Sequence, residues 1–158
     1  MRIRPRRALP RSVEVAVRHI GTGSPFEAQI GYARAVIADR WVFVAGTTGY
    51  DYATMTLPDA VQDQCRNALA TIARVLEEAG SGLDHVVRVT YVLPDRADFA
   101  ACWPLTSVAF ATARPAAMML QAGLMEPAMK IEIEVTARLP PDAADQAASA
   151  GLSPRPRP

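Results

Sequence analysis

The sequence predicts an α+β fold: a single mixed β-sheet with two helices packed on one of its faces. Two observations support this fold class. The chain has 158 residues, half of them hydrophobic, which suits one domain with a sizeable core. Period-2 and helical patterns also follow one another in the order β-β-β-α-β-α-β-β, which places both helices on one side of one sheet. The uncovered face then needs a partner, and self-association is the simplest cover.

The first three strands are predicted from alternating apolar residues. Residues 13–20 alternate with period 2, and the Gly/Pro-rich residues 21–25 end that pattern. Residues 32–37 and 41–45 are two more short strands, with residues 38–40 as the hairpin turn between them.

The helices and the last strands follow from spacing and from end signals. Residues 56–59 (TLPD) resemble a capping box, residues 61–79 carry apolar side chains at helical spacing, and Gly80 ends that helix. Residues 86–93 form a strand rich in β-branched side chains. Asp95 is expected to cap a second helix that runs to about Phe110 and is disturbed at Pro104. Strands at about 117–122 and 129–138 complete the sheet.

Charge divides the chain into three parts. Residues 1–11 hold five arginines and are predicted to be a basic flexible arm, and residues 141–158 are predicted to be a disordered Pro/Ala-rich tail. Residues 12–140, the predicted domain, hold ten basic and fourteen acidic side chains, a net charge of −4. A nucleic-acid binder normally carries its positive charge on the folded surface, so nucleic acid is not an expected partner. The sequence has neither an apolar run long enough for a membrane helix nor a secretory signal, and we expect a cytoplasmic protein.

The sequence offers no common cofactor or metal motif. Cys65 and Cys102 are far apart and are expected to be reduced, buried thiols. His19 and His85 have no metal-ligand partner at a suitable spacing, and the Gly-rich residues 46–49 lack the Lys-Ser/Thr of a phosphate-binding loop and are expected to form a turn. We therefore predict no metal and no cofactor.

The remaining candidates for chemistry are polar side chains at predicted strand ends: Tyr32, Thr47, Thr48, Tyr91, Gln121 and Glu132. Glu132 and Glu134 lie two apart on one strand and so face the same side. An acid on a half-buried strand needs a partner or a chemical role, and for Glu132 an ion pair across a subunit boundary and a functional role are both open. Trp103, Met118 and Met119 belong to an apolar group that, taken alone, indicates core or interface.

The chain resembles the RidA/YjgF/UK114 family between about residues 30 and 139. The resemblance lies in the order and spacing of GY-x-x-AV (31–36), VFVAG (42–46), Q-x-x-x-AL-x-x-I (64–72), LD-x-VV-x-VT (83–90), DF (98–99), PA (115–116) and IEIE (131–134). It implies a RidA-like (chorismate mutase-like) fold and a homotrimer in which the sheet face opposite the helices lines a central barrel. It also implies small-molecule pockets between subunits.

The chain departs from this family at the substrate-binding residues. Members that hydrolyse imines and enamines carry an arginine directly after Pro-Ala, which clamps the substrate carboxylate, and a glutamate fifteen residues later. Here Ala117 replaces the arginine, while Glu132 keeps the glutamate position. The resemblance also places Trp103, Met118, Met119 and the aromatic Tyr32 in the pocket. Arg114, three residues before Ala117, is a candidate substitute for the arginine, although its offset points it to the other face.

These differences from the family predict a pocket that has no arginine to bind a substrate carboxylate and that has one acid, Glu132, in an apolar wall. We expect a homotrimer that binds a small neutral or aromatic metabolite, with hydrolytic or proton-transfer chemistry assisted by Glu132 if it is an enzyme. The alternatives are a 2-iminobutanoate/2-iminopropanoate (enamine/imine) deaminase that uses Arg114 or another arginine, and a non-enzymatic metabolite sensor.

Overall fold

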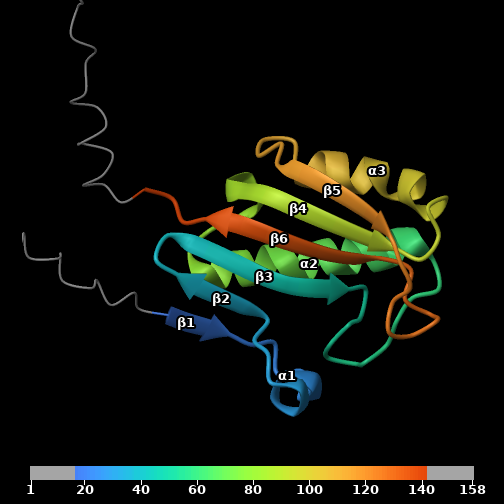
Figure 1. The fold of residues 1–158 in the computed structure, drawn as a ribbon, viewed down its shortest axis with the longest axis horizontal. Coiled ribbons are helices and arrows are strands. Elements are labelled where there is room, and N and C mark those ends of the chain that lie inside the picture. The colour runs from blue at the N-terminus through green and yellow to red at the C-terminus, as the bar shows by residue number, and fades with distance from the viewer. Residues whose placement is uncertain (1–16, 142–158) are drawn as a thin grey trace, which may run out of the picture.

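The computed structural model describes residues 17–141, and in it six strands form one mixed sheet (Figure 1). The strands are β1 (Val17–Ile20), β2 (Ala35–Ala38), β3 (Trp41–Thr48), β4 (Val86–Leu93), β5 (Ala116–Gln121) and β6 (Glu132–Arg138). Their order across the sheet is β1-β2-β3-β6-β4-β5, and only β4 and β5 run parallel. The predicted α+β class with one mixed sheet is confirmed.

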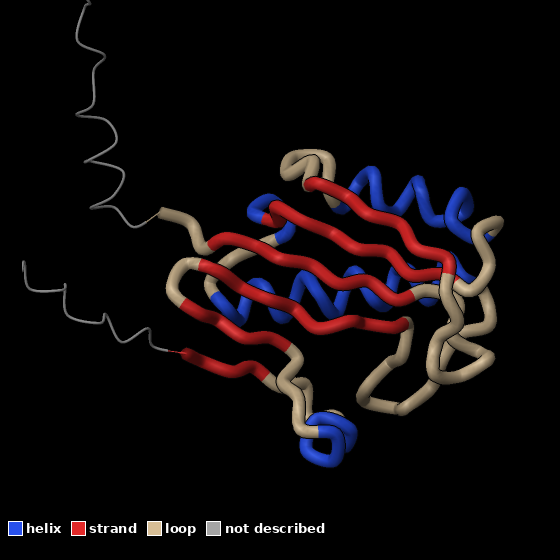
Figure 2. Tube along the Cα trace, viewed as in Figure 1, coloured by secondary structure: helices blue, strands red, loops and turns tan. Residues whose placement is uncertain are grey.

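Two helices, α2 (Val61–Ala79) and α3 (Asp98–Ala109), lie on the same side of this sheet (Figures 1 and 2). The apolar stripe of α2 is buried against inward-facing residues of the central strands, and the core contains Val42, Val44, Ile72, Leu76, Val89, Ile133 and Val135. The ring of Phe99 on α3 packs 5.2 Å from the ring of Tyr91 on β4. Burial of this apolar surface is the main stabilising term for the two-layer arrangement.

The opposite face of the sheet carries exposed apolar side chains. Strand alternation and register place Trp41 and Phe43 of β3 on this face, together with Met118 and Leu120 of β5. All four are more than a third exposed within one protomer. The predicted need for a cover on this face therefore stands, while the homotrimer stays a prediction.

The fold contains a third helix that the sequence analysis missed. Helix α1 (Pro25–Ile30) projects beside the sheet near β2 and β3 (Figure 1). Ser24 caps its first turn by accepting from the Phe26 N–H, Pro25 occupies the first turn, and Gly31 ends it with a φ of 83°. The break predicted at residues 21–25 thus leads into a short helix.

The predicted start signals of both long helices were wrong. Helix α2 begins at Val61 after Ala60, so the predicted capping box does not form, and Thr56 instead bridges to Asp51. Helix α3 begins at Asp98, because the Asp95 carboxylate accepts from the Ala97 N–H in a turn just before it. That helix continues through Pro104.

Other boundaries agree with the sequence or shift by a few residues. The strand predicted at 86–93 and the helix end at Gly80 are confirmed. Strand β2 begins three residues later than predicted, β3 extends to Thr48, and β6 begins at Glu132. A short 3-10 helix, η1 (Leu83–His85), precedes β4. The basic arm, the start of the first predicted strand and the tail beyond residue 141 lie outside the described residues.

Candidate functional site

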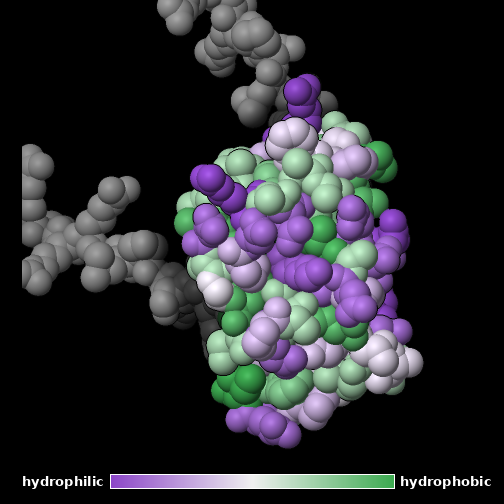
Figure 3. Space-filling view, turned by 90° about the vertical axis from the view of Figure 1, so that its right-hand side faces the viewer, coloured by the Kyte–Doolittle hydropathy of each residue, from purple (hydrophilic) through white to green (hydrophobic). Residues whose placement is uncertain are grey.

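A cavity of about 630 Å³ lies where β3 ends and β6 begins. Its walls come from α1, β3, the loop after β3, and the loop that leads into β6. The lining residues are Phe26, Ile30, Tyr32, Arg34, Ala45, Gly46, Thr48, Tyr50, Tyr52, Met125, Glu126, Met129 and Glu132. Figure 3 views the end of the molecule on the right of Figure 1, where hydrophilic and hydrophobic side chains are intermixed.

Glu132 stands in the wall of this cavity as the first residue of β6. It pairs with Thr48 of β3 on one side and Val92 of β4 on the other, so the sheet fixes its backbone. A Cβ on Gly46 would lie 2.1 Å from its Oε1 atom, so the carboxylate rests on a backbone position that only glycine leaves open. Burial raises the pKa of Glu132 above its ordinary value, and the Arg34 charge opposes that rise.

Arg34 is a cavity residue that the sequence analysis did not single out. Its side chain is only 1% exposed, and the guanidinium is held by three protein acceptors. Nη1 donates to the Gly46 carbonyl at 2.7 Å and to the Thr47 hydroxyl at 3.2 Å, and Nη2 donates to the Tyr32 hydroxyl at 3.0 Å. The Gly46 carbonyl therefore accepts a hydrogen bond from Arg34, and the Glu132 carboxylate lies close to the Gly46 Cα.

Two aromatic rings and one acid complete the surroundings of Arg34. The guanidinium carbon lies 5.4 Å from the ring centre of Tyr32 and 5.1 Å from that of Tyr52, within cation–π range. Nε lies 3.9 Å from Oε1 of Glu27 on α1 and has no hydrogen-bond partner among the described residues. This guanidinium is thus bound to the protein on most of its donors.

The presence of Arg34 corrects one expectation from the sequence. The cavity was expected to contain one acid in an apolar wall, without any guanidinium, but it is lined by Arg34 and by a second acid, Glu126, as well as Glu132. Arg34 occupies one of the two unspecified positions of the GY-x-x-AV motif. A charge within the segment predicted as a strand, residues 32–37, was a usable signal, because a buried charge needs partners.

A buried glutamine fixes the loop that leads into β6. Gln64 on α2 is fully buried, and its Nε2 donates to the carbonyls of Pro58 and Ala128 at 2.7 and 2.9 Å. Its Oε1 accepts from the Lys130 N–H at 2.8 Å. Because this N–H bonds to a side chain, the predicted strand at 129–138 cannot start at residue 129. The same contacts hold the cavity wall that contains Met125, Glu126 and Met129.

Two tyrosines of the loop after β3 also line the cavity. The Tyr50 hydroxyl donates to Glu126 Oε2 at 2.7 Å, which ties this loop to the loop before β6. That hydrogen bond to the carboxylate raises the pKa of Tyr50. Burial raises the pKa of Tyr52, while the nearby Arg34 charge opposes the rise. Residues 46–49, expected to form only a turn, include the end of β3 and the bulge between Val44 and Thr47.

Of the predicted site residues, the structure brings Tyr32 and Glu132 together in this cavity. Trp103 lies on α3, exposed, with its ring edge-on to Phe99 at 6.2 Å. Met119 lines a separate hollow of about 250 Å³ with Phe99 and other residues beside β5. Arg114 is exposed in the turn before β5. Sequence reasoning had placed all of these in one pocket.

Strand register explains why one protomer does not unite them. Ala117 pairs with the core residue Val89, so it faces the helix side of the sheet, whereas Glu132 pairs with Val92 and faces the open side. Met118 does face the open side, as Glu132 does. However, β5 lies two strands away from β6, and Ala117 is also displaced from Glu132 by three residues along the strands, roughly 10 Å in each direction. The proposed binding roles of Trp103, Arg114, Ala117, Met118 and Met119 therefore stay predictions that require a second copy of the chain.

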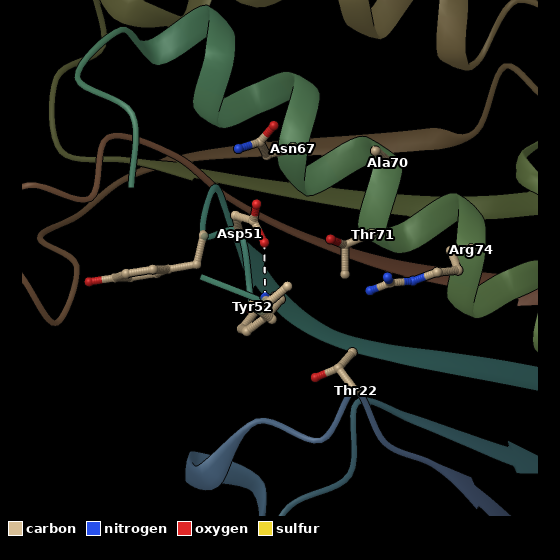
Figure 4. Close-up of a pocket in the computed structure, with 9 residues that line it drawn as sticks. Thr22, Asp51, Tyr52, Asn67, Ala70, Thr71 and Arg74 are labelled. Carbon is tan, nitrogen blue, oxygen red and sulfur yellow. Dashed lines mark hydrogen bonds between the residues drawn. The ribbon is translucent and has the colours of Figure 1, made fainter. Parts of the chain in front are cut away.

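A second depression of about 260 Å³ lies between α2 and the loop after β3 (Figure 4). Thr71 and Arg74 of α2 face Thr22 and Tyr52 across it (Figure 4). Its other polar groups hold the loop: Asp51 accepts from the Ala53 N–H at 2.9 Å, and Asn67 donates to the Gly49 carbonyl at 3.1 Å. Asp51 and Asn67 in this depression therefore serve to hold the loop after β3 in place.

The remaining chemistry-bearing groups are few in the part of the chain that the structure describes. Cys65 and Cys102 are free and fully buried, as predicted, and contact with Cys102 together with burial raises the pKa of the Cys65 thiol. No three His, Cys, Asp or Glu side chains gather as metal ligands within residues 17–141. No helix in that range is long and apolar enough to cross a bilayer.

Comparisons with known proteins identify the family of this chain. The family profile of Endoribonuclease L-PSP matches residues 22–139. The 2-iminobutanoate/2-iminopropanoate deaminase of Capra hircus is 32% identical over 123 residues, which cover 77% of this chain and 90% of that protein. The RutC family protein UK114 of Drosophila melanogaster is 34% identical and covers 75% of this chain and 86% of its own length.

Solved structures show the same fold. A member of the YjgF/YER057c/UK114 family from Mycobacterium tuberculosis superposes with a TM-score of 0.71 at 33% identity, covering 78% of this chain and 99% of that one. A putative endoribonuclease L-PSP from Entamoeba histolytica also gives 0.71, at 28% identity, covering 78% and 100%. With the family profile spanning most of the described residues, this chain belongs to the Endoribonuclease L-PSP family, the RidA/YjgF/UK114 proteins.

Proposed function

We propose that this chain is a small-molecule-binding member of its family that holds a compact, largely apolar metabolite against Glu132. The observation that supports this is the cavity of about 630 Å³ with aromatic and methionine walls and a half-buried carboxylate. A cavity of this size, apolar with a few fixed polar groups, is typical of a metabolite site. No basic surface is needed for such a role, which suits the acidic balance of residues 12–140 better than RNA binding does.

The proposal includes assembly into a homotrimer in which a neighbouring copy completes the site. Two features support it: the exposed apolar face around Phe43 and Leu120, and the separation of Glu132 from the β5 residues within one protomer. A second copy could bring the Met119 side of its β5 edge to the Glu132 cavity. Burial of exposed apolar surface would drive that contact.

Glu132 is the group in the cavity best suited to acid–base chemistry. Its raised pKa makes the carboxylate a stronger base, which can accept a proton from water during attack on a C=N or C=O bond. Hydrolysis of an imine adds one water across the C=N bond and releases ammonia with the carbonyl product. Glu132 would relay both water protons to the nitrogen: one as water attacks the carbon, and the second as the hydroxyl of the addition product becomes the carbonyl and ammonia leaves.

Equilibrium binding, product analysis and sedimentation test the proposal together. We expect the full-length protein to sediment as a trimer and to bind small aromatic alcohols or amides with one site per chain. Glu132→Gln should abolish any turnover while keeping ligand affinity for neutral compounds within a few fold. Binding without product in the wild type would assign a sensor role. A monomer with no ligand response would refute the proposal.

Imine deamination is the second candidate, favoured by the similarity to the 2-iminobutanoate/2-iminopropanoate deaminase of Capra hircus and by the guanidinium of Arg34 near Glu132. It requires a cation that reaches the substrate carboxylate. Assays with freshly generated 2-iminopropanoate should compare the wild type with Arg114→Ala and Arg34→Lys. Turnover that survives Arg114→Ala but is lost in a folded Arg34→Lys variant would assign the carboxylate contact to Arg34.

A further inference from the structure

The charge that the cavity presents to a ligand is negative. Glu132 is half-buried in its wall, and Glu126 is exposed at its edge. Among the described residues none donates a hydrogen bond to the Glu132 carboxylate, while the Glu126 carboxylate accepts only from the neutral Tyr50 hydroxyl. Both carboxylates therefore have acceptor capacity directed to whatever enters.

Arg34, the one cation among the described residues that line the cavity, donates its hydrogen bonds to the protein. Arg34 is 1% exposed, and its two terminal nitrogens donate to Gly46, Thr47 and Tyr32. Its third nitrogen, Nε, lies 3.9 Å from the Glu27 carboxylate and has no hydrogen-bond partner among the described residues. Because the Arg34 side chain is buried, a ligand carboxylate has little access to the guanidinium, and it would meet Glu132 and Glu126 on its way. Like charges brought together in a partly desolvated site are strongly unfavourable.

The remaining wall suits a cation with an apolar body. Phe26 and Ile30 of α1 and Met125 and Met129 of the loop before β6 supply apolar surface. Aromatic faces attract cations through their quadrupole, as Tyr32 and Tyr52 do with Arg34. Tyr50 adds a further ring beside Glu126. Apolar bulk and an acceptor carboxylate thus lie within one cavity.

We propose that this cavity selects a ligand that carries a protonated nitrogen, an amine or an iminium group, on a compact apolar body. This inference rests on the proposed function, because it names the ligand class of the same site. The protonated nitrogen donates to Glu132, the apolar body packs on the methionine and aromatic wall, and Arg34 holds that wall in place. Ligands whose only charge is a carboxylate are rejected.

Three probes of nearly equal shape test the choice of charge: phenethylamine, 2-phenylethanol and 3-phenylpropionate, each titrated calorimetrically into the full-length protein at neutral pH. We expect phenethylamine to bind at least ten-fold more tightly than 3-phenylpropionate, with an affinity that falls as salt is added. Glu132→Gln should weaken the amine about ten-fold and leave the alcohol unchanged. Glu134→Gln, the same charge change two residues along β6, is the matched control and should alter neither.

The outcomes separate this inference from the proposed function. If the alcohol binds and 3-phenylpropionate binds as tightly as the amine or more tightly, the charge selection is wrong while the small-molecule site stands. Loss of that carboxylate binding in Arg114→Ala, or in Arg96→Ala at the hollow that Met119 lines, would then place a cation of a neighbouring copy in the site. If none of the three probes binds, both the ligand class and the small-molecule function fail.

Discussion

The Glu132 cavity and the β5 edge, two regions that sequence reasoning joined into one pocket, are built in opposite ways. At the cavity, Arg34, Gly46 and Glu132 are buried or half-buried, and each is fixed by at least one neighbour. Along β5, every residue from Ala116 to Gln121 is exposed within the protomer. The polar residues of the cavity are thus held in place within one protomer, whereas β5 is mainly exposed surface. A substitution in the cavity should therefore change folding stability and ligand binding, whereas a substitution in β5 should change assembly.

The largest expected effect comes from removing the buried guanidinium. Arg34→Ala leaves the Gly46 carbonyl, the Thr47 hydroxyl and the Tyr32 hydroxyl without their donor and opens space beside two rings. We expect it to lower the free energy of unfolding by about 3 kcal/mol or more, measured by urea denaturation. Arg114→Ala, an exposed arginine before β5, is the control and should cost less than about 0.5 kcal/mol. Equal losses of stability in the two variants would contradict this difference between the cavity and the β5 edge.

Gln64→Ala should have the next largest effect, because it frees the loop that forms one cavity wall. Two carbonyls lose their donor and the Lys130 N–H loses its acceptor. A loss of about 2–3 kcal/mol is expected, together with faster hydrogen exchange in residues 125–131. Gln62→Ala, exposed on the same helix, provides the comparison. Unchanged exchange in this loop would show that Gln64 does not hold it.

Gly46→Ala should act on the ligand more than on the fold. The added Cβ would fall 2.1 Å from Oε1 of Glu132, so the carboxylate has to move. We expect ligand affinity to fall about ten-fold, with a stability loss of about 1 kcal/mol. Gly82→Ala serves as the control, because a Cβ there meets no atom within 4 Å. An unaltered affinity would mean that the position of Glu132 is not important for binding.

At the β5 edge, Ala117→Arg should leave the protomer's stability within about 0.5 kcal/mol, since the position is exposed. Its expected effect is on assembly and on the ligands that the assembly accepts, measured by sedimentation and by the three-probe titration. If β5 of one copy meets the Glu132 cavity of another, the new guanidinium should raise 3-phenylpropionate affinity. A large loss of stability would mean that β5 belongs to the protomer's core.

The smallest effect concerns pH. The pKa of Glu132 lies above its ordinary 4.5 in the folded state, mainly because burial disfavours the charged form. Below pH 4.5 the carboxyl is neutral in both states; as pH rises above this value the unfolded chain loses its proton first, so the free energy of unfolding falls until the folded carboxyl also ionises. Glu132→Gln should remove this decline and be slightly more stable than the wild type at neutral pH. If the free energy of unfolding changes with pH in the same way in the two proteins, the raised pKa of Glu132 is contradicted.

Much of the fold could be predicted because local patterns and tertiary packing agree. Residues 61–80 repeat apolar side chains at helical spacing and end at glycine, and residues 86–93 are a β-branched run. Predictions failed where a side chain from elsewhere took a backbone group. Gln64 accepts the Lys130 N–H and delays β6. Helix α1 was missed although Ser24, Pro25 and Gly31 gave its start and end signals.

The candidate site was predictable only in part. Glu132 and Tyr32 were found because their residue types and positions match the family motifs, and both line the cavity. Arg34 was missed because its partners lie 12 and 13 residues away on β3, and only strand pairing brings them within reach. Glu126 was missed because its loop acquires a place only through Gln64 and Tyr50.

The sequence by itself determined the α+β class and the family, and it singled out Glu132 and Tyr32, because each of these is a matter of residue type, order and spacing. The tertiary structure decided which charges meet. Strand register put Ala117 and Glu132 on opposite faces, and the pairing of β2 with β3 buried Arg34 beside the acid. Electrostatic interactions depend on distance and burial in space, and neither of these is fixed by separation along the chain.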